Sequence, residues 1–371
     1  MKIEIVEKAK SILSNRESFH NYFAWPTVTR LPDGNLAAVA SGYRLRHVCP
    51  FGKCVIAYSF NEGKSWTRPA PVIDTPLDDR DAGIAVSGNR VILTSFNNDV
   101  KMQRSWNNDK TQAYYHSKKE AYVDAYLDKV AETDAEEKYL GSVYTVSEDG
   151  GYNFGPIKKC PITSPHGPST THDGGLFYVG RDFTLGDHDF TKQILCYMMD
   201  EKGDFLPVGV IPDLPESLHC IMCEPHAIML PDGKIIVHIR VENVGSVSPE
   251  EKVFTIYQSE STDGGKTFTA PHQLLSQTGG SPAHLLLLKD GRLLSVYGYR
   301  EKPYGIRAMI SKDGGETWQT DLIIHADEVD PDVGYPASVE LENGDILTVF
   351  YAHPEKGMPC EICQTIWRIA E

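Results

Sequence analysis

Acidic, basic, aromatic and histidine side chains stand at the start of six apolar segments spread along the 371-residue chain. In chain order they are Trp25, Arg80 with Asp81, His166, Glu224 with His226, His284, and Tyr335. Carboxylic acids, phenols and imidazoles can support nucleophilic and acid–base catalysis when they converge in a concave site. Whether they converge depends on the elements that hold them.

Four copies of a turn sequence indicate what those elements are. Each copy follows the pattern S-x-D/N-x-G-x-x-W/F, and the copies begin at Ser59, Ser147, Ser261 and Ser311. The Asp or Asn side chain can bond to nearby backbone N–H groups, and Gly takes the positive φ of a tight turn. The closing aromatic residue can pack the hairpin onto a core. The chain is therefore predicted to be an array of similar hairpins.

A second repeat, offset along the chain from the first, gives the number of structural units. An alternating strand, a D-G or N-G turn and another apolar strand begin near residues 26, 81, 168, 225, 282 and 336, mostly about 55 residues apart. Four strands per repeat predict an all-β, six-bladed β-propeller that spans residues 1–371 as a single domain. The first strand of each blade should line the central channel, which would gather the side chains above at one rim. One of the two terminal strands is expected to join the other terminal blade and close the ring.

One interval between repeats is too long. The excess is 97–140, and residues 120–130 have apolar positions at helical spacing without Gly or Pro. We expect a helical insertion within the propeller. It could decorate one blade, act as a lid, or form a subunit contact in a homo-oligomer.

Composition limits the possible partners. The formal net charge of −15 argues against binding of nucleic acid or anionic membranes. The first six residues contain no apolar signal core, and no run approaches membrane-spanning length, so a soluble, cytoplasmic protein is expected. An anionic substrate would need a local arginine cluster to overcome the overall repulsion.

The eight cysteines fit a reducing compartment. They include two C-x-x-C pairs, Cys220/Cys223 and Cys360/Cys363. A six-fold ring places these pairs far apart, so buried thiols are expected rather than zinc. The histidines have no helical or tight-hairpin ligand spacing, and neither a metal nor a cofactor is predicted.

With these turns and rim residues, the chain resembles the sialidase superfamily, the Asp-box or BNR-repeat glycoside hydrolases. Glu224, an inner hairpin with Asp232-Gly233, and then Arg240 are similar to the family's glutamate, hairpin and arginine. Gly334-Tyr335-Pro336-Ala337-Ser338, leading on to Tyr351, resembles the segment that carries the family's tyrosine nucleophile. The resemblance covers most of the chain.

The resemblance implies exo-hydrolysis of a terminal acidic sugar, sialic acid or a relative, from a glycan with retention. Tyr335 would attack the anomeric carbon while Glu224 takes its proton. A neutral tyrosine suits this substrate because a charged nucleophile would be repelled by the sugar carboxylate. Arg240 and Arg300 would grip that carboxylate, since arginine offers planar, bidentate donors.

Other residues are candidates by position. Substrate contacts are expected from the arginines and from rim groups that could stack on the sugar or bond its hydroxyls, namely Arg44, Arg80, Arg307, Trp25, His166 and His284. Two residues are candidates for the general acid. They are Asp81, which opens the second inner strand, and His47 in the loop after the first hairpin. A rim lined by apolar groups could keep Asp81 protonated.

One departure from the family pattern keeps alternatives open. The F/Y-R-I-P of sialidases is replaced by Ala24-Trp25-Pro26-Thr27, so the first carboxylate-binding arginine is missing. Arg44, Arg46 or Arg80 could replace it, or the substrate could lack such a carboxylate. The alternatives are a glycosidase or lyase for another sugar that uses rim histidines, and a non-catalytic glycan-binding propeller.

Overall fold

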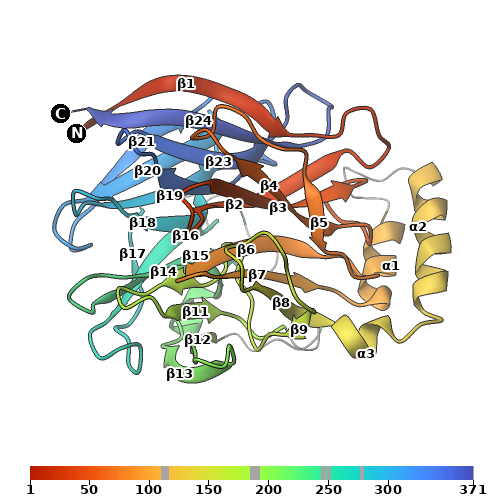
Figure 1. Cartoon of the computed structure of the whole chain (residues 1–371), viewed down its shortest axis with the longest axis horizontal. Helices are drawn as coiled ribbons and strands as arrows, with labels where there is room; N and C mark the ends of the chain where they lie inside the picture. Colours follow the sequence, from red (N-terminus) through yellow and green to blue (C-terminus); the bar gives the residue numbers. More distant parts are fainter. Residues whose placement is uncertain (110–116, 184–192, 244–247, 249–251, 276–279, 371) are drawn as a thin grey trace.

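The computed structural model describes residues 1–370 apart from 110–116, 184–192, 244–247, 249–251 and 276–279. The described residues form six four-stranded antiparallel sheets, so the predicted six-bladed β-propeller is confirmed (Figure 1). The strands, blade by blade, are β2 (Tyr22–Arg30), β3 (Leu36–Arg44), β4 (Lys53–Ser59) and β5 (Ala70–Ile73); β6 (Arg80–Ser87), β7 (Arg90–Asn97), β8 (Gly141–Ser147) and β9 (Lys158–Lys159); β10 (Ser169–Thr170), β11 (Leu176–Gly180), β12 (Ile194–Met199) and β13 (Phe205–Ile211); β14 (Cys220–Met229), β15 (Ile235–Asn243), β16 (Phe254–Ser261) and β17 (His272–Gln273); β18 (Gly280–Leu287), β19 (Leu293–Tyr299), β20 (Gly305–Ser311) and β21 (Gln319–His325); β22 (Gly334–Glu340), β23 (Ile346–Ala352), β24 (Glu361–Ala370) and β1 (Lys2–Leu13).

The ring closes through the two ends of the chain. β1 pairs antiparallel with β24, which places the N-terminal strand at the outer edge of the blade made by β22, β23 and β24. In Figure 1 the red and blue termini lie side by side. The predicted closure by a terminal strand is confirmed.

The core lies between neighbouring blades. Leu31 and Ile56 of the first blade pack against Ile84, Val91 and Leu93 of the second, all with almost no exposed surface. Full burial of such a side chain stabilises a fold by roughly 1.5–3 kcal/mol. The first strands of the blades contact one another around the ring and line the channel. Their starts therefore converge at one rim, as the repeat predicts.

The repeated turns fold as their sequences require. In each copy the Ser hydroxyl accepts from the backbone N–H of the second Gly position, at 2.9–3.0 Å. The Asp or Asn oxygen accepts from the N–H four residues on, at 2.9–3.0 Å. The closing aromatics pack on the preceding blade: Trp66 donates to Gln364 at 2.7 Å and Trp318 donates to Gln258 at 2.8 Å. Each turn thus fixes a hairpin and joins two blades.

The insertion between β7 and β8 is helical, as predicted. It contains α1 (Val100–Asn108), α2 (Ser117–Val130) and α3 (Ala135–Tyr139), and these helices lie together at one side of the molecule (Figure 1). Val123 and Leu127 pack against Leu45 and Cys49 of the loop that follows β3. The insertion therefore supports a rim loop of the first blade. A subunit contact through it stays a prediction.

Among the described residues, no helix is long and apolar enough to span a membrane.

Candidate active site

Four of the predicted rim residues share an unusual backbone conformation. Trp25, Asp81, Glu224 and Tyr335 have φ angles of 55°, 49°, 48° and 48°. Each lies where the pairing of the first and second strands of its blade shifts register. Such a conformation costs about 1–3 kcal/mol for a non-glycine residue, and register breaks redirect side chains. Four blades thus use the same strained bulge to present a side chain at the rim.

Three of the predicted residues form one hydrogen-bonded group. The Tyr335 hydroxyl donates to Glu224 Oε1 at 2.5 Å. Arg240 Nη1 donates to Glu224 Oε2 at 2.6 Å and lies 3.4 Å from the Tyr335 hydroxyl. The three residues come from β22, β14 and β15. A phenol bonded to a carboxylate that an arginine orients can act as a nucleophile paired with a base.

The charges of this group fit that pairing. Burial and the Glu224 carboxylate raise the pKa of Tyr335 well above its ordinary value, so the phenol is neutral. Burial alone would raise the pKa of Glu224, but Arg240 and the hydrogen bond from Tyr335 hold it below its ordinary value. Arg240 also contacts Glu242 Oε2 at 2.5 Å, so two carboxylates share its guanidinium. Glu224 is therefore ionised and able to accept a proton.

Arg300 also lies close to the tyrosine. Its guanidinium is 5.8 Å from the centre of the Tyr335 ring, and Nη2 donates to the Tyr351 hydroxyl at 2.7 Å. Nε donates to the Val333 carbonyl at 2.9 Å. Tyr351 in turn donates to Asp332 Oδ1 at 2.9 Å. Arg300 is thus positioned at the rim by the segment that leads into β22.

Of the two carboxyl groups among the predicted rim residues, Asp81 and Glu224, Asp81 is the one whose surroundings favour the protonated form. It is buried, and its Oδ1 has no hydrogen-bond partner among the described residues. Burial raises the pKa of Asp81 to about 7; the neighbouring Arg80 charge lowers it, and Glu224 raises it further. A carboxyl group with a pKa near neutrality can act as a general acid.

His47, the other candidate acid, is bound in a different network. Its Nδ1 lies 2.9 Å from the Tyr22 hydroxyl and 3.2 Å from Asp332 Oδ1, and its ring packs edge-on against Trp25. Burial lowers the pKa of His47, although Asp332 acts in the opposite direction. A histidine that is neutral near pH 7 is a poor proton donor, so the geometry favours Asp81.

Arg44 cannot grip a substrate, contrary to the sequence-based prediction. Its side chain is fully buried and forms a 2.6 Å ion pair with Asp78. It also donates to the Ser41 hydroxyl at 2.8 Å and to the His47 carbonyl at 3.0 Å. These bonds hold the rim loop after β3 in place, and reaching the site would deprive the buried Asp78 of its closest cation.

The Arg44→Met variant is therefore expected to lose about 3 kcal/mol of unfolding free energy, because removing one partner of a buried ion pair leaves the other uncompensated. Arg80 at 3.8 Å and Gln103 at 3.0 Å also contact Asp78 and keep the loss near the lower end of the usual range. Urea unfolding at pH 7 measures it. Lys129→Ala, which removes an exposed ion pair on α2, serves as the control. A loss below about 1 kcal/mol, typical of surface pairs, would contradict this role.

Arg307 and Trp25 also differ from their predicted roles. Arg307 lies on β20, the third strand of its blade, where it pairs with Asp321 at 3.2 Å and stacks 3.9 Å from the Tyr299 ring. It therefore does not reach the rim.

Trp25 is only 2% exposed, and the Arg80 and Arg44 guanidinium groups lie 4.4 and 4.8 Å from its ring centre. Trp25 packs against the rings of Tyr335 and Tyr351 and is not an open sugar platform, whereas Arg80 lies beside Asp81.

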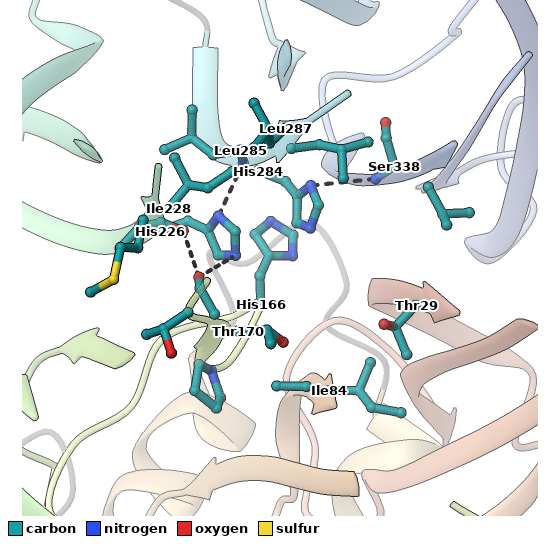
Figure 2. Close-up of a pocket in the computed structure, with 18 of the residues that line it drawn as sticks. Thr29, Ile84, His166, Thr170, His226, Ile228, His284, Leu285, Leu287 and Ser338 are labelled. Carbon is teal, nitrogen blue, oxygen red and sulfur yellow. Dashed lines mark hydrogen bonds between the residues drawn. The ribbon is translucent and has the colours of Figure 1, made fainter. Parts of the chain in front are cut away.

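His166 and His284 lie within the channel, together with His226. Their ring centres are 4.5–5.7 Å apart, and they line a cavity of about 430 Å³ (Figure 2). Other lining residues, such as Thr29 and Leu287, belong to the C-terminal ends of the inner strands. The cavity therefore lies toward the opposite end of the channel from Tyr335 and Glu224. Burial lowers the pKa of all three histidines, and for His284 to about 3, so they are neutral.

Sequence reasoning missed two of the groups that organise the rim. Asp332 accepts from Tyr22 at 2.8 Å and from Tyr351 at 2.9 Å. Tyr22 precedes Trp25 by three residues and Asp332 precedes Tyr335 by three residues, so both occupy the same offset before a bulge. That shared offset is the signal that could have identified them.

The family assignment follows from the sequence match. The chain matches the family of BNR repeat-like domains over residues 147–348, which is more than half of its length. The chain therefore belongs to this family. A search of curated proteins finds no match.

Solved structures share the fold at low sequence identity. A protein of unknown function from Dyadobacter fermentans superposes with a TM-score of 0.75 at 21% identity over 99% of both chains. The NanB sialidase from Streptococcus pneumoniae gives 0.63 at 12% identity, over 97% of this chain and 70% of that one. An α-L-arabinanase from Penicillium chrysogenum gives 0.62 at 13% identity over 97% of both chains. The propeller is thus related in fold to several glycoside hydrolases.

Proposed function

We propose that this protein is a glycoside hydrolase that removes a terminal acidic sugar, sialic acid or a relative, from a glycan with retention of configuration. One observation carries the proposal. The Tyr335 hydroxyl donates at 2.5 Å to Glu224, and Arg240 contacts the other carboxylate oxygen at 2.6 Å. This arrangement provides a neutral nucleophile, its base and a group that orients the base.

In the first half-reaction the Tyr335 oxygen bonds to the anomeric carbon as its proton passes to Glu224. The bond from that carbon to the leaving oxygen breaks, and Asp81 gives this oxygen its proton. In the second half-reaction ionised Asp81 takes a proton from water, the water oxygen bonds to the same carbon, and Tyr335 leaves with the proton held by Glu224. Two displacements on opposite faces give net retention.

The cations near Tyr335 support an anionic substrate. Arg240 and Arg300 both lie close to the tyrosine, and Arg80 lies beside Asp81. A carboxylate of the sugar would bind to arginine through charge-assisted, directional hydrogen bonds.

A second candidate function is hydrolysis of a neutral sugar. Glu242 competes with any substrate carboxylate for Arg240, and Arg44 is held by Asp78. Among the described residues these pairs reduce the positive charge offered to a ligand. The related fold is also used by an α-L-arabinanase, which is complexed with arabinobiose in its structure.

Turnover of two kinds of fluorogenic substrate tests the proposal. We expect the α-ketoside of N-acetylneuraminic acid to be hydrolysed and α-L-arabinosides to be inert. Proton NMR of the first product should show the α-anomer before it mutarotates. Arabinoside turnover alone would establish the second candidate, and a β-anomer as first product would exclude the tyrosyl intermediate.

The pH dependence of hydrolysis tests Asp81. A general acid must be protonated, and burial raises the pKa of Asp81 to about 7, so kcat/KM should fall as pH rises above about 7. Asp81→Asn should remove this limb and lower the rate on a natural glycan by about 10²–10⁴-fold. A substrate with an acidic phenol as leaving group needs less protonation and should be less affected. An alkaline limb unchanged in Asp81→Asn would contradict the assignment.

A further inference from the structure

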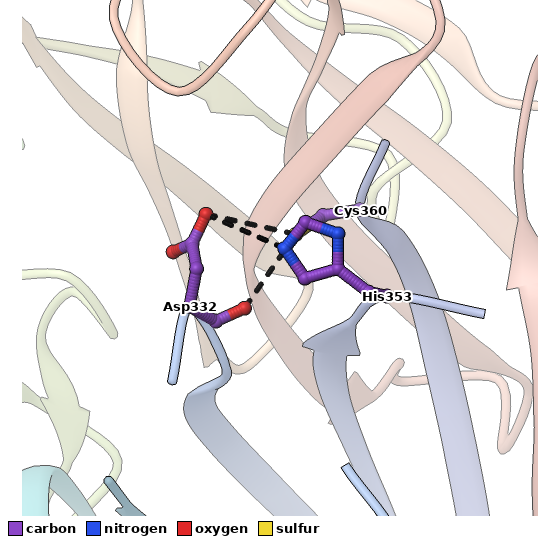
Figure 3. Close-up of side chains that lie close together, drawn as sticks. All are labelled: Asp332, His353 and Cys360. Carbon is purple, nitrogen blue, oxygen red and sulfur yellow. Dashed lines mark hydrogen bonds and ion pairs between the residues drawn. The ribbon is translucent and has the colours of Figure 1, made fainter. Parts of the chain in front are cut away.

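A second cluster of chemically reactive side chains lies beside the proposed active site. Asp332 precedes β22, His353 follows β23 and Cys360 precedes β24, so three consecutive strands of one blade bring them together (Figure 3). Cys360 Sγ lies 3.1 Å from His353 Nε2, and Asp332 Oδ2 lies 3.8 Å from each of these atoms. The proposed glycosidase mechanism uses none of the three.

These separations are close to those of metal ligands. Zn²⁺ binds nitrogen and oxygen at about 2.0–2.2 Å and sulfur at about 2.3 Å in tetrahedral geometry, which places ligand atoms about 3.4–3.6 Å apart. Shifts of a few tenths of an ångström would bring all three atoms to these distances. The set also combines a cysteine sulfur, an imidazole and a carboxylate, which suits Zn²⁺ rather than Ca²⁺ or Mg²⁺.

The surrounding hydrogen bonds orient the three groups as ligands. His353 Nδ1 lies 2.5 Å from the Met358 carbonyl, which can only accept, so Nδ1 carries hydrogen and Nε2 faces Cys360 and Asp332. Tyr22 and Tyr351 donate to the two oxygens of Asp332 at 2.8 and 2.9 Å. Metal-binding histidines and carboxylates are commonly oriented in this way by outer partners.

The cluster is open to solvent on one side and is held by a packed core, and both properties are suited to a metal site. The side chains of Asp332 and His353 are 27% and 15% exposed, so an ion can reach the cluster from solvent. Cys360 is buried and packs in the same core cluster as Trp25, Tyr335 and Tyr351. The ligands therefore stand on a fixed scaffold with one open side.

We propose that Asp332, His353 and Cys360 form a Zn²⁺ site, with water in the fourth position. The Cys360 thiol loses its proton to solvent when its sulfur binds the ion. The ion shares Asp332 with Tyr351, and Tyr351 accepts from Arg300, so the bound metal steadies the segment that leads to Tyr335. This proposal does not depend on the reaction that the site catalyses.

Metal titration of the full chain tests the site. After removal of metal with a chelator, we expect calorimetry to show saturable binding of one Zn²⁺ per chain. With Co²⁺ as the probe, a sulfur-to-metal charge-transfer band should appear in the near ultraviolet. Thermal unfolding should shift to higher temperature with Zn²⁺, since ligands that bind the folded state stabilise it.

Three variants decide whether these residues are the ligands. Cys360→Ser should abolish the Co²⁺ charge-transfer band and weaken Zn²⁺ binding at least about tenfold, the smallest loss expected even for an outer partner. Cys363→Ser is the matched control: Cys363 lies three residues further along the chain, within β24, and packs in a different core cluster, with Trp367 and Phe350. It should keep both signals. His353→Gln removes a ligand from a partly exposed loop and provides the test if Cys360→Ser does not fold.

Two results would overturn the proposal. One is the absence of a one-to-one Zn²⁺ isotherm in the wild-type chain, which would leave the cluster as a thiol–imidazole hydrogen bond. The other is equal binding by wild type, Cys363→Ser and either ligand variant, which would place the ion elsewhere. Neither result bears on Tyr335, so failure here is separate from failure of the proposed function.

Discussion

The Tyr335→Phe variant is expected to lose at least about 10³-fold in kcat on the acidic-sugar substrate, while its thermal unfolding stays close to that of the wild type. The substitution removes only the hydroxyl that forms the bond to the anomeric carbon. The Phe ring keeps the packing of Tyr335 against Trp25 and Tyr351. The loss should therefore appear in the chemical step, which single-turnover kinetics with a fluorogenic α-ketoside measures directly.

A control and a chemical probe sharpen this experiment. Tyr58→Phe also removes one tyrosine hydroxyl, which donates to the Gly151 carbonyl in the contact between the first two blades, and should leave the rate unchanged. A fluorinated substrate that traps the intermediate should label Tyr335 in the wild type, with the sugar located by peptide mass spectrometry. Near-normal turnover by Tyr335→Phe would remove the nucleophile assignment and favour a carboxylate or histidine mechanism.

Glu224→Gln is expected to lower kcat by about 10²–10⁴-fold, the usual contribution of a positioned base. An amide cannot take up the Tyr335 proton, although its oxygen can still accept the hydrogen bond that Glu224 receives from this hydroxyl at 2.5 Å. Arg240 keeps Glu242 as a partner, so its charge stays compensated and unfolding stability should change less than in a variant that leaves a buried charge alone. Stopped-flow kinetics and urea unfolding on the same preparation separate the two effects.

Glu242→Gln is the matched control for Glu224→Gln. It also removes one carboxylate from Arg240 but leaves the Tyr335–Glu224 hydrogen bond in place. We expect its turnover number to stay near the wild-type value and its KM for an anionic substrate to fall, because Arg240 becomes more available. Equal losses of turnover in the two variants would show that the charge balance of Arg240, and not proton transfer to Glu224, controls the rate.

The backbone at the rim explains why these side chains can act together. Trp25, Asp81, Glu224 and Tyr335 all have positive φ values at a register shift, and none is glycine. Strain of this kind persists only where the surrounding structure enforces it, and it clusters at functional sites. The well-packed blades keep these four residues in place, so their arrangement at the rim does not depend on a bound ligand.

Much of the fold could be predicted from the sequence because its signals are local. The hydrogen bonds of the Asp313 turn connect residues within four positions of one another, so the repeated turns identify themselves. The repeat spacing then gives six blades, and the helical pattern at 120–130 gives the insertion. Glu224, Arg240 and Tyr335 could be named because their places in this repeat resemble those of a known family.

Only the tertiary structure decided which charged residues are available and which are already paired. By its position in the sequence Arg44 is a candidate substrate ligand, but in the structure Asp78 neutralises it within the core. Arg307 likewise pairs with Asp321, away from the rim. The cluster of Asp332, His353 and Cys360 joins three strand ends with no ligand spacing in the sequence. The physical reason is that burial and ion pairing depend on contacts between distant segments, whereas turns and strand repeats depend on neighbours along the chain.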